Sequence, residues 1–217
     1  MMSRPRITMP NRTADSDAEI TLDLLTAVES ERPHSQRSLA NELGVALGLT
    51  NAYVRRCVKR GWIKATQAPA NRYAYYLTPK GFSEKSRLTA RYLRSSFSFY
   101  RRARNEVDEL LAACVAKGHK RIALAGRGEI AEIAVLCATQ HPLEIVAMLD
   151  SGNEPTFLGI PVVADVKYAA NLDAVIITDM KSGQTTYDRL GPAIPGVDLH
   201  APNILRIDRR KKEGEKP

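Results

Sequence analysis

The sequence predicts an α/β protein of several domains: a small helical domain with a hairpin, a long connecting helix, and a small parallel sheet. Three observations predict this order. Two short helical patterns precede two strand-like runs, an apolar stripe of helical period follows, and short apolar strands then alternate with helices. The expected bounds are a lead-in at 1–16, the first domain at 17–81, the long helix at 82–117, the sheet domain at 118–207 and a basic tail at 208–217.

Charge divides the 217-residue chain in a similar way. Residues 1–118 hold 20 basic and 11 acidic residues, a net charge of +9, whereas residues 119–207 hold 7 and 10, a net charge of −3. A basic part beside an acidic part indicates two modules, of which the first faces a polyanion. A basic surface that serves only solubility is the alternative.

Cysteine usage and hydropathy indicate the compartment. Cys57, Cys114 and Cys137 are widely spaced among apolar residues, which is typical of reduced, buried thiols in a cytosolic protein. The chain has no run of 18 apolar residues, and its N-terminus lacks the apolar segment of a secretory signal. We therefore expect a cytoplasmic protein that does not enter the membrane. A redox-sensing role for the thiols is the alternative.

The first domain is organised around residues 35–60. Ser35 is expected to cap a helix that ends near Leu43, and Gly44 supplies the positive φ of a tight turn. A second helix over about 48–60 follows this turn. Two helices joined in this way form a helix-turn-helix, whose second helix enters the major groove of DNA. A helix over 18–31 precedes the motif, and the residues expected to face the core are Ile20, Leu24, Leu25, Val28, Leu39, Ala40, Leu43, Val45, Leu47, Val54, Cys57 and Val58.

The exposed side of the second helix carries groups that can read bases. Asn51, Arg55 and Lys59 recur at every fourth residue and therefore share one stripe. Asn can pair with adenine and Arg with guanine. A solvated helix face that contacts nothing is the alternative.

Two strand-like runs after this helix predict a β-hairpin. Residues 62–66 and 73–77 are joined by a short loop, as in the wing of a winged helix-turn-helix. Arg72, with Lys64 nearby, is expected to meet the phosphate backbone or the minor groove. The aromatic residues of the hairpin are interpreted as packing groups rather than base-stacking groups.

Two runs in this region carry a family resemblance: LANELGVALGLTNAYVRRCVKRGWIK, and then RYAYYLTPKGFSEKSRLTARYL. They resemble winged-helix regulators of the MarR type over about residues 18–105, and in particular the subgroup associated with exopolysaccharide biosynthesis genes. The resemblance implies a transcriptional regulator in which Asn51, Arg55, Arg56 and Arg72 face DNA. The full set of DNA-facing candidates is Ser35, Gln36, Thr50, Asn51, Arg55, Arg56, Lys59, Lys64 and Arg72.

A long helix is expected to begin at Thr78-Pro79 and to reach about Lys117. Its apolar residues recur at spacings of three, four or seven: Leu88, Tyr92, Phe99, Ala103, Val107, Leu110 and Cys114. Pairing with a second copy is the simplest way to cover this stripe, and a homodimer would present two recognition helices to two half-sites. The alternative is that the stripe packs on the chain's own C-terminal domain.

The sheet domain begins with a pattern typical of nucleotide binding. A strand over 120–125 leads into a G-x-G-x-x-A turn at Gly126, and a helix follows. A second strand over 145–149 ends at Asp150, which lies 22 residues after Gly128. The glycines allow close backbone approach, the helix N-terminus favours a phosphate, and the acid suits ribose hydroxyls. A fold that keeps the turn but binds no ligand is the alternative.

The rest of the domain continues the pattern of strands and helices. Thr178 would lie at the carboxyl edge of the sheet, where ligands bind in such folds. The further strands expected are 159–163, 173–179 and 203–207, and the further helices are 165–171 and 182–190.

The strand-GxGEIAEIA-helix run, the strand that ends in Asp and the later F-L-G-I-P-V run also carry a resemblance. They resemble the small Rossmann-like domain of sugar O-acyltransferases and the nucleotide-binding half of the NADH-sensing repressor Rex. The resemblance implies a nucleotide sugar or NAD(H) as the ligand. The ligand-binding candidates are Gly126, Arg127, Gly128, Glu129, Ile130, Asp150 and Thr178.

Together these features predict a dimeric transcriptional regulator that binds double-stranded DNA and senses a small nucleotide ligand. We expect no enzymatic activity, because the four histidines are scattered and the sequence shows no cluster of metal ligands. A nucleotide- or sugar-modifying enzyme with an appended DNA-binding domain is the main alternative, and a scaffold that binds proteins is another.

Overall fold

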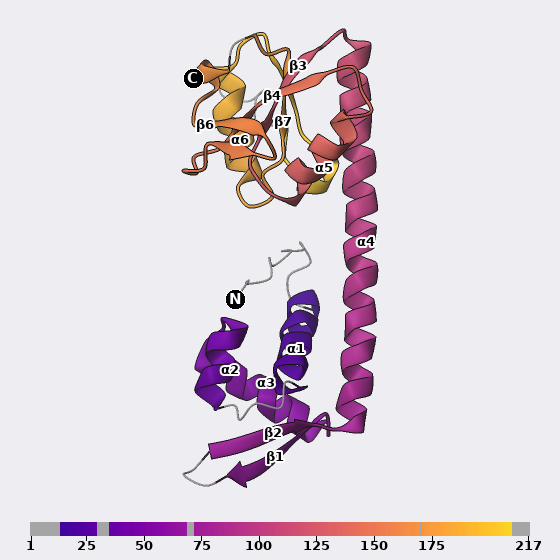
Figure 1. Ribbon diagram of the computed structural model, residues 1–217, viewed down its shortest axis with the longest axis vertical. Helices are drawn as coiled ribbons and strands as arrows, with labels where there is room; N and C mark the ends of the chain where they lie inside the picture. Colours follow the sequence, from indigo (N-terminus) through magenta and orange to yellow (C-terminus); the bar gives the residue numbers. More distant parts are fainter. Residues whose placement is uncertain (1–13, 30–34, 69–71, 170, 210–217) are drawn as a thin grey trace. The chain divides into compact units, whose positions relative to one another are not determined.

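The computed structural model describes residues 14–29, 35–68, 72–169 and 171–209 (Figure 1). The chain forms two compact units, Met1–Ser96 and Phe97–Pro217, and the boundary falls within one long helix. Most of the expected lead-in and of the basic tail lies outside the described residues. Among the described helices, none combines the length and the hydrophobicity that a membrane span needs.

Unit 1 contains the predicted helix-turn-helix and hairpin. One core holds Leu24 and Leu25 of the first helix, Leu39 of the second and Cys57 of the third, all fully buried. The first helix begins earlier than expected and the third one residue earlier. The elements are α1 (Ala14–Glu29), α2 (Gln36–Leu43), α3 (Leu47–Lys59), β1 (Ile63–Ala68) and β2 (Arg72–Leu77).

The turn between α2 and α3 follows the predicted chemistry. The Ser35 hydroxyl accepts a hydrogen bond from the Ser38 amide at 3.0 Å, and the Ser38 hydroxyl lies 2.9 Å from the Ser35 amide, so the two residues form a capping box. Gly44 ends α2 in the left-handed region at φ 61°. Leu47 was expected to face the core beside the turn, but this prediction is wrong because its side chain is 41% exposed.

The hairpin pairs β1 with β2 antiparallel, and Ile63 lies opposite Leu77. Only some of its aromatic side chains pack as expected. Tyr75 and Trp62 are buried, whereas Tyr73 and Tyr76 are about half exposed.

The long helix α4 (Pro79–Ala116) matches its prediction closely in length. Thr78 caps it, because its hydroxyl accepts from the Gly81 amide at 3.0 Å. At the same time the hydroxyl donates to the Gly61 carbonyl at 2.7 Å, which ties the helix start to the base of the hairpin.

The apolar stripe of α4 is covered within the chain. Leu88 belongs to the core of unit 1, while Phe99, Ala103 and Val107 are buried in unit 2. Cys114 is buried too, and the buried leucine is Leu111 rather than Leu110. The alternative of packing on the C-terminal domain therefore holds for the second half of the stripe, and pairing with a second copy is not needed to cover it.

Unit 2 is a six-stranded sheet with helices on both faces. The strand order is β5-β6-β4-β3-β7-β8; all pairs are parallel except β5 with β6. The chain moves outward from β3 in one direction through β4 and β6, and in the other through β7 and β8. The elements are β3 (Arg121–Ala125), α5 (Glu129–Ala138), β4 (Glu144–Leu149), β5 (Thr156–Phe157), β6 (Ile160–Val163), η1 (Val166–Tyr168), β7 (Ala174–Ile177), α6 (Gly183–Ala193), β8 (Asp198–His200) and η2 (Asn203–Leu205).

Alternation along β3 divides the core into two layers. Ala123 and Ala125 face a cluster that includes Tyr187 and Leu190 of α6, whereas Leu124 points to the opposite face. In Figure 1, α5 and the turns of α4 beside it lie on one face of the sheet, and α6 lies on the other face.

The last strand was predicted in the wrong place. Residues 203–205 form a 3-10 turn that Arg206 ends at φ 52°, and the edge strand is instead β8. The short run Asp-Leu-His was missed because its polar residues break the apolar pattern by which a buried parallel strand is found. The strand expected over 173–179 is also shorter, since Thr178 and Asp179 already belong to the following loop.

Candidate functional site

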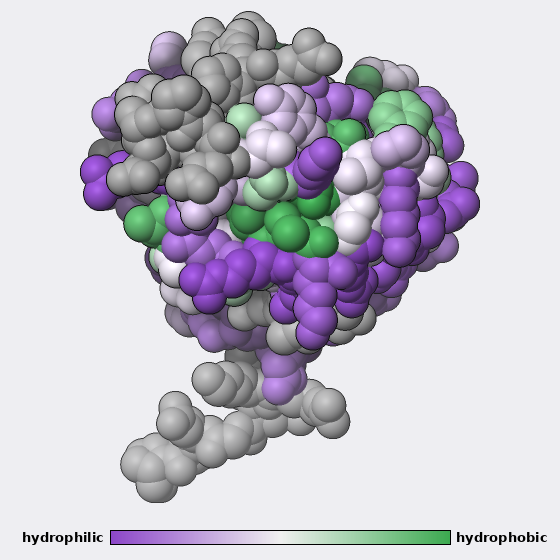
Figure 2. All heavy atoms as spheres, turned by 90° about the horizontal axis from the view of Figure 1, so that it is seen from below, coloured by the Kyte–Doolittle hydropathy of each residue, from purple (hydrophilic) through white to green (hydrophobic). Residues whose placement is uncertain are grey.

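The recognition helix α3 presents a basic surface on the side away from the core. Arg55 and Lys59 are exposed on α3, and Lys64 is exposed on β1. Gly48 and Ala52 lie on the same outward face, one and two turns earlier, because these residues are spaced by three and four. Seen from the end that carries β1 and β2, hydrophilic side chains surround a small group of hydrophobic ones (Figure 2).

Arg56 is held by unit 1 itself. Its guanidinium forms an ion pair with Asp17 of α1 at 3.2 Å and stacks over the Tyr53 ring at 4.9 Å. Tyr53 donates a short hydrogen bond to the same carboxylate. The bonds from Tyr53 and Arg56 lower the pKa of Asp17, while burial and that carboxylate raise the pKa of Tyr53 to about 12. Arg56 therefore fastens α1 to α3, and only its remaining N–H groups can meet DNA.

Three other DNA-facing candidates have structural partners. Thr50 is fully buried and its hydroxyl donates to the Ala46 carbonyl at 3.2 Å, so its assignment to the DNA surface is wrong. The Ser35 hydroxyl is used in the helix cap. Gln36 donates to the Tyr75 hydroxyl at 3.3 Å, which joins α2 to the wing.

Asn51 is half-buried beside the exposed stripe. Its side-chain oxygen is buried and has no hydrogen-bond partner among the described residues. A buried acceptor without a partner costs about 1–3 kcal/mol, so turning this amide toward a hydrogen-bond donor is favourable. Arg72 begins β2, but its side chain lies outside the described part of the chain.

Several features of this surface escaped sequence reasoning. Leu49 is 44% exposed and Val58, expected in the core, is 39% exposed. Arg60 stacks over the Trp62 ring at 4.8 Å, which fixes a cation at the base of the wing. The adjacent Arg-Gly-Trp run was the only signal of that contact.

The glycine turn after β3 has the predicted form. Gly126 takes φ 99°, and a Cβ at this position would overlap Asp179 after β7. Its amide donates to the Leu149 carbonyl at 3.0 Å, and its carbonyl accepts from the Thr178 hydroxyl. The turn is therefore bonded to both neighbouring strands, and the Gly126 amide is already used within the protein.

Arg127 and Asp150 are brought together, but they bind each other. The Arg127 Nε lies 3.0 Å from Asp150 Oδ1, and another guanidinium nitrogen lies 3.1 Å from Glu154. Asp150 also accepts from the amides of Gly152 at 2.8 Å and of Arg127 at 3.3 Å. Burial opposes ionisation of Asp150, but these bonds outweigh it and hold its pKa below the ordinary value.

The remaining ligand candidates contribute little exposed side-chain surface. Thr178 and Ile130 are fully buried, so Thr178 lies beneath the turn and does not line an open edge. Gly128 caps α5, and Glu129 and Glu132 are in its first turn. These two carboxylates partly neutralise the positive potential of the helix N-terminus, which a phosphate would need.

A separate polar cluster lies at the other end of β3. Asp198 bonds Lys117 at 2.6 Å, and the rings of His119 and His200 lie 3.7 and 3.8 Å from the same oxygen. The side chain of His141 is only 15% exposed and contacts Asp108 at 2.8 Å. Within the described ranges, no three His, Cys, Asp or Glu side chains form a group that could hold a metal ion.

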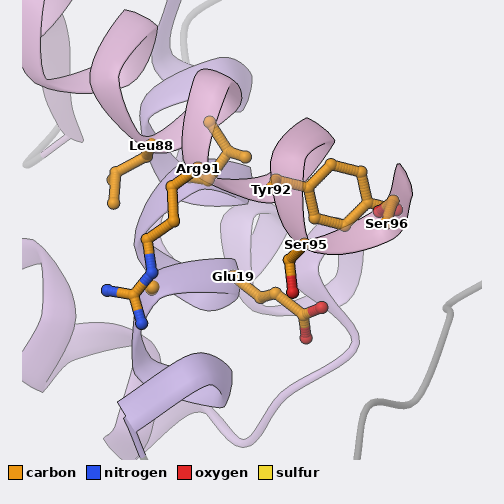
Figure 3. A pocket seen from close by; sticks show the side chains of 8 residues that line it. Glu19, Leu88, Arg91, Tyr92, Ser95 and Ser96 are labelled. Atoms are coloured by element: carbon orange, nitrogen blue, oxygen red, sulfur yellow. The ribbon is translucent and has the colours of Figure 1, made fainter. Parts of the chain in front are cut away.

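Unit 1 also contains a small crevice between α1 and α4. Figure 3 shows Arg91, Tyr92 and Ser95 of α4 near Glu19 of α1. Its volume of about 30 Å³ has room for a few water molecules but not for a nucleotide.

The comparisons with known proteins agree with the geometry of unit 1. Residues 17–64 match a family described as winged helix-turn-helix DNA-binding. The matched segment covers most of α1, then α2 and α3, and reaches the start of β1. The N-terminal part of the chain is therefore a winged helix-turn-helix domain.

Solved structures give weaker likenesses. The PcaV transcriptional regulator from Streptomyces coelicolor is 24% identical over 37% of this chain and 60% of its own, with a TM-score of 0.35. The MepR–DNA complex from S. aureus is 16% identical over 39% and 60%, with a TM-score of 0.33. This chain thus spans three fifths of the length of both regulators.

Some likenesses extend over more of the chain. The mitomycin 7-O-methyltransferase MmcR is 12% identical over 85% of this chain and 76% of its own, with a TM-score of 0.36. At such TM-scores these structures carry no argument about function. No curated protein sequence matches the chain significantly.

Proposed function

We propose that the chain is a DNA-binding transcriptional regulator whose winged helix binds operator DNA as a homodimer. The observation that carries the proposal is the match of residues 17–64 to winged helix-turn-helix DNA-binding domains, together with Arg55, Lys59 and Lys64 exposed on that domain. Exposed cations on the outward face of a recognition helix are suited to phosphates and base edges.

A charge-matched pair of variants tests DNA binding. Arg55→Ala should weaken binding of the full chain at least fivefold to a duplex that the wild type has selected from a random library, because it removes one direct contact. Arg189→Ala makes the same change in net charge at an exposed position of α6, and should leave the affinity within twofold. Equal affinities of Arg55→Ala and the wild type in a gel shift at fixed salt would contradict the proposal.

The homodimer must use a surface other than the buried stripe. The exposed large apolar residues of α4 are Phe82, Leu93, Phe97 and Tyr100. Exposed aromatic and aliphatic side chains on a helix favour association with a partner. Native mass spectrometry should report a dimer for the wild type, and Phe97→Ser, at a position 59% exposed, should shift it toward the monomer.

We further propose that unit 2 is a Rossmann-like domain that senses a nucleotide-type ligand, a nucleotide sugar or NAD(H). Supporting this, the order of the parallel strands reverses at β3, and Gly126 and Asp150 follow the two adjacent strands β3 and β4. In sheets of this kind ligands bind at such reversal points. Arg127 blocks direct binding of a ribose at Asp150, because the ribose could reach this carboxylate only after the guanidinium moved away.

Protein isolated from cells should show whether a nucleotide is present. Native mass spectrometry should find added mass that Asp150→Ala removes, while DNA affinity stays unchanged. Asp188→Ala changes an exposed carboxylate of α6 and should keep the added mass. An enzyme acting on nucleotides or sugars is the alternative, and turnover of NADH or a nucleotide sugar by the pure protein would favour it.

A further inference from the structure

The outward face of α3 is small and apolar at its beginning and basic at its end. Ala52 is exposed, and at Gly48 the space that a Cβ would enter contains no atom within 4 Å. Arg55 and Lys59 continue the same face toward the C-terminus. The first two turns, which reach deepest into the major groove in a helix-turn-helix, therefore carry no cation at their centre.

Exposed leucines lie on both sides of this small surface. Leu47 is 41% exposed and Leu49 is 44% exposed, although both lie in the first turn of a helix whose other face is fully packed. One exposed leucine is ordinary on a protein surface. Two leucines beside Gly48 and Ala52 make an apolar surface at the end of the helix that meets DNA. The apolar group that base edges offer in the major groove is the 5-methyl group of thymine.

Asn51 favours the same base pair by a different interaction. Its unpartnered side-chain oxygen gains a donor when the amide turns toward the N6 group of adenine, and its NH₂ group then faces N7. Glutamate or aspartate, which would accept from cytosine, is missing from α3. Arg55, one turn further on, remains for a phosphate or a flanking guanine.

We propose that the first two turns of α3 read A·T base pairs, with Ala52 and its flanking leucines on thymine methyl groups and Asn51 on adenine. This inference rests on the proposed function, because it needs α3 to lie in the major groove. It assigns the specificity of the domain to a set of uncharged side chains.

Replacement of thymine by uracil tests the proposal directly. The full chain is first used to select duplexes from a random library, and the selected duplex is then synthesised with deoxyuridine in place of thymidine. Uracil keeps every hydrogen bond and lacks only the methyl group. We expect A·T pairs at adjacent positions of each half-site, and a loss of affinity of roughly threefold to fivefold for each contacted methyl.

Variants assign the contact to side chains. Ala52→Gly, Leu47→Ala and Leu49→Ala are each measured as a ratio of affinities for the thymine and uracil duplexes, so that any effect on folding cancels. At least one of them should bring the ratio at one position close to one. Val58→Ala changes an exposed apolar residue near the other end of α3 and should leave the ratio unchanged.

The outcomes separate this inference from the proposed function. Selected sites rich in G·C pairs, or equal affinity of the wild type for the two duplexes, would overturn the inference and leave DNA binding intact. A wild-type ratio that none of the three variants changes would overturn the assignment to α3. A library from which the wild type retains no duplex at low salt would contradict the proposed function itself.

Discussion

At the scale of single residues, Arg127 has the closest bearing on the ligand site. Its guanidinium joins Asp150 and Glu154, and it lies so close to Gly152 that any side chain there would collide with it. Asp150 therefore has an internal cation where a ligand hydroxyl was expected. A ligand must displace this cation or bind beside it.

Arg127→Met should destabilise the protein by about 1 kcal/mol at pH 7, since Asp150 keeps only its bonds to backbone amides. The folded-state pKa of Asp150 lies below its ordinary value of 3.8. Its ionisation therefore adds stability above that pH, and this stability is lost as the pH falls through the folded pKa. Urea unfolding should show a difference between variant and wild type that shrinks below pH 4. A difference that is constant from pH 7 to pH 2.5 would contradict this account.

Two helix glycines in unit 1 make a matched pair. A Cβ at Gly81 would overlap the Trp62 carbonyl, whereas a Cβ at Gly48 meets open space. Gly81→Ala should cost about 1–3 kcal/mol, because the first turn of α4 must move away from the hairpin. Gly48→Ala should stabilise by up to about 1 kcal/mol. Thermal unfolding of both variants tests this contrast. Changes in Tm of the same sign and similar size would contradict it.

The three cysteines are expected to react slowly in the folded protein. Cys57, Cys114 and Cys137 are buried, and burial raises the pKa of each thiol, that of Cys57 to about 11. Because the thiolate is the reactive form, labelling with a thiol reagent at pH 8 should be slow until the protein is unfolded, when all three react. Rapid labelling of one cysteine in the native state would instead support a redox role.

Residue by residue, the sequence predicted local chemistry better than tertiary partners. The Ser35 cap, the Gly44 turn and the Gly126 turn depend on neighbouring residues, and all three were found as expected. Helical spacing could not show that Thr50 is fully buried, or that a neighbouring element, α1, places Asp17 beside Arg56 at the edge of the exposed face.

At the scale of elements, α4 is the helix whose observed packing differs most from the packing that the sequence predicted. Its second half is fixed to unit 2 by polar contacts as well as by its stripe. The Glu106 carboxylate accepts from the Ile204 amide at 2.6 Å, and Asp108 contacts His141. Heptad-like spacing indicates that one face is buried, but it does not say whether a second copy or the same chain covers it.

Substitution along α4 should separate core positions from exposed ones. Leu111→Ala should destabilise the protein by about 2–5 kcal/mol, because Leu111 is fully buried. Leu93→Ala, at a position 46% exposed, should change stability by less than about 0.5 kcal/mol. Chemical unfolding measured at low protein concentration checks this. A larger effect for Leu93→Ala would indicate that the exposed apolar face of α4 is covered from outside the chain.

Strands of unit 2 were predictable where they are central and apolar. The positions of β3, β4 and β7 followed from runs such as Ala174–Ile177, which is buried throughout. The edge strand β8 could not be found, since its pairing with β7 depends on the tertiary course of the chain after α6. The ligand site was predicted as a set of residues, but the mutual ion pair of Arg127 and Asp150 depends on side-chain geometry that spacing does not contain.

At the scale of the whole molecule, the chain joins a basic winged helix-turn-helix domain to an acidic sheet domain. The first is matched to DNA-binding domains over residues 17–64, and the second has the strand order and glycine turn on which the ligand proposal rests. In the proposed account a ligand would act by binding two arrangements of the molecule with different affinity.

The central claim is that this chain binds duplex DNA through the exposed side chains of α3. Fluorescence anisotropy of a labelled selected duplex, titrated with the full chain at several salt concentrations, tests it most directly. The wild type should bind with a steep salt dependence, and Arg55→Ala should bind more weakly with a slope reduced by about one. If Arg55→Ala matches the wild type in both affinity and slope, the account is contradicted.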